Sequence, residues 1–221
     1  MSHSANLEVL LSFAIGFILA PMSVLAEPVP PPFSLSGATS IQTLRAPPPS
    51  TIRLGRTKLT LERMPLAQLR RLAGAGEIAH RGDASESTYW LCYTIQTPAT
   101  SQRIWFLAGE LNGPEHFVSG VQATSLQAAE GAKEGCPLLP PHLQPIALDS
   151  GLWLGKAKSE WLETLGKPSS SEPDSLSFEY AGKVPSQYEG KKIPLDRINY
   201  LHLVLKDDRV QGLIAWQTTT Y

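Results

Sequence analysis

Two sets of short strand-like runs constrain the fold of this chain more than any other feature. The runs are rich in aromatic and β-branched residues and are separated by turn residues, a pattern that predicts antiparallel strands. In the last two runs, Leu201, Leu203 and Leu205 fall on one face, and the intervening Lys206-Asp-Asp-Arg209 suits a tight hairpin turn. The first set covers residues 89–97, 103–107 and 117–124, and the second covers residues 176–180, 200–205 and 210–216.

A short helical segment precedes each set of strands. Residues 65–73 carry apolar side chains at helical spacing, with a proline at the start and Gly74 at the end, where a left-handed residue is favoured. Residues 158–165 form a second such segment, which Gly166 ends and Pro168 prevents from resuming. The same order of elements, a helix followed by strands, therefore occurs twice in the chain.

The same order is marked by two similar tetrapeptides, Ile52-Arg-Leu-Gly55 and Leu152-Trp-Leu-Gly155. One short helix and three strands make a thin layer that buries little by itself, so two such layers side by side could form a continuous sheet with the helices behind it. We therefore predict an α+β fold of two tandem repeats, each a short helical segment packed on an antiparallel sheet of three to four strands. The expected boundaries are 52–134 for the first repeat, 135–147 for the connection and 148–221 for the second. A single α+β domain with accidental similarity between its halves is the alternative.

Three segments of the second half resemble a known repeat. They are Leu154-Gly-Lys-Ala-Lys-Ser-Glu-Trp-Leu162, Leu165-Gly-Lys-Pro-Ser169 and Leu201-His-Leu-Val-Leu-Lys-Asp-Asp-Arg-Val-Gln-Gly212. They look like the SmpA/OmlA repeat, which occurs in the small subunit of the outer-membrane assembly machine and, in tandem, in the secreted β-lactamase inhibitor protein. The resemblance covers residues 148–217 and extends weakly to 52–124. It implies a tandem helix-plus-sheet protein that binds other proteins, and it brings no shared catalytic residues.

The N-terminal segment predicts export. Residues 9–20 are apolar and uncharged, Pro21 follows, and Val24-Leu-Ala26 suits signal peptidase, so residues 1–26 are interpreted as a cleaved signal peptide. An uncleaved membrane anchor is the alternative. Residues 27–51 are rich in proline and serine and are expected to be a disordered, extended leader. The expected location is periplasmic or secreted, with no stable membrane insertion after cleavage.

The net charge and the two cysteines limit the partners and the cellular compartment that are expected for this protein. The chain has 19 Lys and Arg and 20 Asp and Glu, and removing residues 1–26 removes only Glu8, so the remainder has 19 − 19 = 0 net charge. Nucleic-acid binders usually carry a basic excess, so nucleic acid is not expected as a partner. Cys92 and Cys136 are expected to form a disulfide in an oxidising compartment. A reactive thiol is the less favoured alternative.

No catalytic, cofactor or metal-binding motif is apparent. The histidines lack the spacing of metal ligands, and there is no Gly-x-Ser-x-Gly elbow. We therefore expect a non-catalytic module that binds an unidentified protein partner, or assists envelope assembly, through a sheet face rich in aromatic residues. An uncharacterised hydrolase-like enzyme and an envelope structural protein that acts through its leader are the alternatives. The candidate binding residues are Trp90, Tyr93, Trp105, Tyr200, His202 and Trp216.

Overall fold

The computed structural model describes residues 29–32, 44–97, 100–127, 135–188 and 191–220. The segment interpreted as a signal peptide, residues 1–26, lies outside these residues. Within the described residues, no helix is both long enough and apolar enough to cross a membrane.

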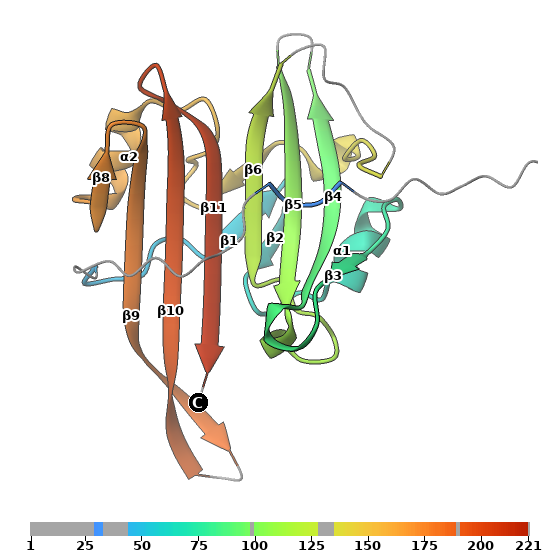
Figure 1. Cartoon of the computed structure of the whole chain (residues 1–221), viewed down its shortest axis with the longest axis vertical. Coiled ribbons are helices and arrows are strands. Elements are labelled where there is room, and N and C mark those ends of the chain that lie inside the picture. Colours follow the sequence, from blue (N-terminus) through green and yellow to red (C-terminus); the bar gives the residue numbers. More distant parts are fainter. Residues whose placement is uncertain (1–28, 33–43, 98–99, 128–134, 189–190, 221) are drawn as a thin grey trace, which may run out of the picture.

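An antiparallel sheet of eight strands dominates the described part of the chain (Figure 1). Neighbouring strands pair antiparallel throughout, and β6 joins the two strand sets by pairing with β11 from Gly120–Trp216 to Thr124–Gly212. The β9–β10 hairpin extends past the end of β11 and projects beyond the neighbouring strands. In spatial order the strands are β3 (Ala79–Arg81), β4 (Thr88–Gln96), β5 (Ser101–Gly109), β6 (Gly120–Leu126), β11 (Arg209–Thr220), β10 (Lys191–Lys206), β9 (Ser175–Tyr188) and β8 (Ser170–Glu172).

A second layer covers one face of this sheet. It contains a three-stranded sheet and the two helices α1 (Leu66–Ala73) and α2 (Lys158–Leu165). Short 3-10 turns at Ala84–Glu86 (η1), Glu110–Asn112 (η2) and Pro141–Leu143 (η3) connect the elements. The core lies between the layers, where side chains of β4, β5, β6, β9, β10 and β11 pack with both helices in one apolar cluster. The strands of the small sheet, in order, are β2 (Thr57–Thr60), β1 (Thr51–Leu54) and β7 (Ile146–Leu148).

The expectation of two tandem α+β repeats is wrong. The described part of the protein is mostly β, and it has one eight-stranded sheet and a separate three-stranded sheet in place of two similar α+β units. The strand β7, from the expected connection, pairs with β1, which precedes the first helix. Apolar periodicity records which face of each element is buried, but it does not record which elements share a core. Here the core is shared by both halves, so neither half forms its own layer.

The disulfide between Cys92 and Cys136 is confirmed, and it fastens a segment onto the edge of β4. The Thr94 N–H donates to Pro137 O at 2.8 Å, and the Leu139 N–H donates to Thr94 O at 2.8 Å. Residues 137–139 thus pair with one end of β4, while β3 pairs with its other end. Covering a strand edge in this way hides backbone groups that would otherwise recruit another chain.

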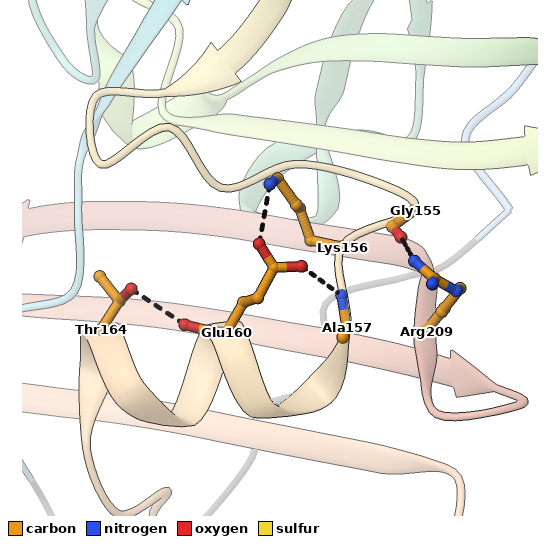
Figure 2. A network of polar contacts seen from close by, with 6 residues as sticks. All are labelled: Gly155, Lys156, Ala157, Glu160, Thr164 and Arg209. Carbon is orange, nitrogen blue, oxygen red and sulfur yellow. Dashed lines mark hydrogen bonds and ion pairs between the residues drawn. The ribbon is translucent and has the colours of Figure 1, made fainter.

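The helix α2 is joined to the turn between β10 and β11 (Figure 2). Glu160 accepts from the Ala157 N–H at 3.0 Å and from Lys156 Nζ at 2.7 Å, so one carboxylate satisfies a free N–H at the helix start. These two hydrogen bonds, first that from Lys156, lower the pKa of Glu160. Arg209, at the start of β11, donates to Gly155 O at 2.8 Å. The helix therefore keeps its position relative to the last hairpin.

Parts of the Pro-rich leader contact the main sheet. Trp105 Nε1 donates to Val29 O at 2.9 Å, and the Leu44 N–H donates to Glu179 O at 2.6 Å. Val29 packs on the cluster around the disulfide, whereas Leu44 packs against the main core.

Candidate functional site

The candidate site is the face of the eight-stranded sheet that points away from the helices and the three-stranded sheet, here called the outer face. Side chains alternate between faces along each strand, so the strand register fixes which residues share it. The register aligns them in three rows running from β4 to β9. The first row is Thr94, Arg103, Thr124, Gly212, Val204 and Ser175; the middle row is Cys92, Trp105, Gln122, Ile214, His202 and Ser177; the third row is Trp90, Leu107, Gly120, Trp216, Tyr200 and Glu179.

The β4–β5 end of the outer face is a buried apolar cluster. Trp90 is 3% exposed and Trp105 is 2% exposed, and both pack with the Cys92–Cys136 disulfide. Val29 of the leader packs against the same cluster. Trp90 and Trp105, two of the six candidate binding residues, therefore offer little surface to a partner in this structure.

A third candidate, Tyr93, lies on the core face of the sheet and is fully buried. Its hydroxyl donates to Ala75 O at 2.8 Å, and its ring meets that of Phe106 edge-on. Burial raises the pKa of the Tyr93 phenol. The side chain ties the end of α1 to β4, so we assign it a structural role.

The other three candidates meet at the β10–β11 end of the outer face, where all are partly exposed. Tyr200 is in register with Trp216, and the Tyr200 and His202 rings are nearly parallel, with centroids 6.1 Å apart. The Trp216 indole lies over Gly120, where any side chain would collide with it, and its Nε1 donates to Thr218 Oγ1 at 2.6 Å. Beside them Ile198 is 49% exposed. Sequence reasoning missed Ile198, although its position two residues before Tyr200 on β10 places it on the same face.

A serine and a histidine form a hydrogen bond beside these aromatic residues. Ser177 Oγ is 2.9 Å from His202 Nδ1 and 3.4 Å from the Tyr200 hydroxyl. Burial lowers the pKa of His202, and the nearby negative charge of Asp174 opposes that shift. The imidazole is therefore mainly neutral at neutral pH, a state in which it can accept a proton.

Two buried polar side chains in the middle of the outer face have unsatisfied hydrogen-bonding atoms. Arg103 is 5% exposed, and its Nε and Nη2 have no hydrogen-bond partner among the described residues. Gln122 is fully buried, and within the same residues neither its Oε1 nor its Nε2 is bonded. Sequence reasoning missed both residues. The alternation of Arg103 with Trp105 places it on the face of the disulfide, but sequence alone does not show that it is buried.

Two histidines that are distant in sequence, His80 and His116, come together at the ring of Tyr89. The Tyr89 ring is stacked between His80, at 4.3 Å between centroids, and His116, at 3.8 Å. His80 Nε2 is also 2.6 Å from Ser87 Oγ. Within the described residues, no group of three or more His, Cys, Asp or Glu side chains is arranged to hold a metal ion.

Comparison with known proteins identifies no relative. No family model matches the sequence, no curated protein matches it, and no solved structure matches it.

Proposed function

We propose that the protein is exported and binds a protein partner through the β10–β11 end of the outer face. The observation that carries this proposal is the grouping of Tyr200, His202, Trp216 and Ile198 on one face of two paired strands. Aromatic side chains bury a large area for little loss of conformational entropy, and they dominate the energetics of many interfaces. The strands that carry them are backed by the main core, so the surface is preorganised.

The disulfide supports the export part of the proposal. Disulfides persist in oxidising compartments, such as the periplasm and the extracellular space, and are rare in the cytosol. The apolar segment at residues 9–20 agrees with this location.

Affinity capture from envelope extract tests the binding proposal. Ile198→Asp places a charge on the proposed surface, and Trp216→Ala removes its largest side chain. Leu72→Asp is the matched control, because Leu72 is 37% exposed on α1, in the layer on the other side of the sheet. A protein retained by the wild type and by the Leu72 variant, but lost with Ile198→Asp, is the expected result. Equal retention by the wild type and all three variants would contradict the proposal.

A second candidate function is hydrolysis, which the hydrogen bond between Ser177 Oγ and His202 Nδ1 favours. A fluorophosphonate probe tests it directly: Ser177 Oγ would attack phosphorus, fluoride would leave, and His202 would accept the serine proton. Labelling of the wild type that is lost in Ser177→Ala supports this function. Absence of labelling in the wild type argues against it and leaves the binding proposal standing.

A further inference from the structure

An arginine without a counterion lies in the middle of the outer face. Moving a charge out of water is costly unless it is paired, so a buried guanidinium normally has a carboxylate or an acceptor network around it. In the described residues, Arg103 takes part in no ion pair. Glu179, the acidic residue of the three rows, is on β9, four strands from β5, or about 19 Å at ordinary strand spacing.

The unsatisfied atoms of Arg103 have a specific geometry. Nε and Nη2 lie along the same edge of the guanidinium, and their N–H bonds are nearly parallel. This edge binds a carboxylate in a bidentate manner, with one oxygen on each N–H. In the part of the chain that the structure describes, neither of these Arg103 donors has a hydrogen-bond partner.

The surroundings of Arg103 complete the site. Gln122 is a diagonal neighbour on β6, because Arg103 pairs with Thr124 and Trp105 pairs with Gln122, and long side chains reach across such a diagonal. Its unpaired Nε2 can donate to the same anion. In the row of Arg103, the next positions are Thr124, with a small side chain, and Gly212, with none. These two positions therefore place no large side chain beside Arg103, although the unpaired atoms of Arg103 and Gln122 are themselves buried in the unbound protein.

We infer that Arg103 and Gln122 form a carboxylate-binding site, which receives an acidic side chain of the protein partner. The three rows contain no Lys and no other Arg, so one positive charge is available, which suits a monoanion better than a phosphate dianion. The inference rests on the proposed function, because the same face would meet the partner, and it adds the chemistry that the partner must present.

Purified protein and small probes test the site without the partner. The probes are the blocked tripeptide acetyl-Ala-Glu-Ala-amide and sodium acetate, and the neutral controls are acetyl-Ala-Gln-Ala-amide and acetamide, all at constant ionic strength. At a concentration about ten times Kd, a ligand raises the ratio of folded to unfolded protein about elevenfold. This corresponds to a rise in Tm of about 3 to 6 °C for a chain of this size. The Glu peptide is expected to give such a rise and the Gln peptide none.

The responses to the two carboxylate probes show whether the ligand is a side chain of the partner or a free small acid. A response to the Glu peptide at lower concentration than acetate supports a partner side chain. A response to acetate at equal or lower concentration supports the carboxylate site but assigns it to a free small acid. Equal responses to the Glu and Gln peptides, or no response to any carboxylate, would overturn the inference.

Variants of Arg103 distinguish ligand binding from a structural role. Arg103→Met keeps the length and apolar volume but removes the charge, so Tm without ligand is expected to be unchanged or higher, and the carboxylate response is expected to vanish. Arg71→Met, at an exposed position of α1, is the matched control. Arg103→Lys keeps the charge without the two parallel donors, and it should lose most of the response even if the Met variant fails to fold. A large fall in Tm of both Arg103 variants, or a wild-type response in Arg103→Lys, would refute the site. If the Glu peptide raises Tm but affinity capture retains no partner, the carboxylate site stands and the proposed function fails.

Discussion

Removing the disulfide is expected to lower the free energy of unfolding by about 4 kcal/mol. Cys92 and Cys136 are 44 residues apart, and the chain-entropy model gives about 4 kcal/mol for closing a loop of that length in the unfolded chain. For a protein of this size, that loss corresponds to a fall in Tm of about 8 to 16 °C. The variant is Cys92→Ala combined with Cys136→Ala, because a single replacement would leave a free thiol.

The loss of stability should also be greatest in the region that the disulfide holds in place. The disulfide fastens residues 137–139 onto β4, through the hydrogen bonds of Thr94 and Leu139. We therefore expect the amides of Thr94 and Leu139 to exchange with solvent faster in the double variant, while amides of the β10–β11 pair change less.

Urea denaturation of the oxidised wild type, the reduced wild type and the double variant measures the effect, and hydrogen exchange followed by NMR measures its location. The reduced wild type serves as the control for packing changes caused by alanine. A loss below about 1 kcal/mol would refute the loop-entropy argument at this site, since the model assigns most of the stabilisation to the unfolded chain. Uniform acceleration of exchange over the whole sheet would refute the local part.

Three further perturbations test other contacts. Glu62 accepts hydrogen bonds from Gln217 Nε2, Thr219 N and Thr219 Oγ1. Glu62→Ala should therefore cost about 1.5 to 3 kcal/mol in urea denaturation, whereas the exposed control Glu163→Ala should cost little. Gly120→Ala should displace the Trp216 ring, with a changed tryptophan emission and a loss of about 1 to 3 kcal/mol; an unchanged spectrum would contradict the packing described. Burial lowers the pKa of His202, so the unfolded chain binds a proton more readily, and stability should decrease as pH falls below about 6.5 towards the lowered folded pKa. His202→Gln should flatten that part of the pH profile, and an identical profile in the variant would show that another group causes the slope.

Much of the local structure could be predicted from the sequence. The helix at residues 158–165 has the bounds expected from its periodicity and its terminal glycine, and the helix at residues 66–73 differs from expectation by one residue. The turn at residues 206–209 has Asp207 and Asp208 at positive φ, as a tight hairpin requires. These features depend on neighbouring residues, which is why the sequence contains enough information to place them.

The length of the last hairpin could not be predicted. Strands were expected at residues 176–180 and 200–205, but β9 runs to Tyr188 and β10 begins at Lys191. The added part contains Pro185 opposite Pro194, residues that cannot donate to a strand ladder and that therefore argue against a strand when only the sequence is considered. Cross-strand pairing at the other positions compensates for their missing donors.

The candidate site could likewise be predicted only in part from the sequence. Sequence alone selected six side chains for their chemistry, but only the tertiary structure separated the buried Trp90, Tyr93 and Trp105 from the partly exposed group on β10 and β11. Arg103 and Gln122 could not be selected, because an arginine in a strand is ordinary until its burial and its missing partner are known.

The sequence by itself determined the helix ends to within one residue, the approximate location of the six strands β4, β5, β6, β9, β10 and β11, the alternation of faces, and the disulfide between the two cysteines. Only the tertiary structure decided that β6 joins β11, that β7 pairs with β1, and that the two halves share one core. The physical reason is range: caps, turns and periodicity follow from residues within one or two turns of chain. The sharing of a core depends instead on which apolar faces meet across long sequence separations, where many pairings compete and no local pattern distinguishes them.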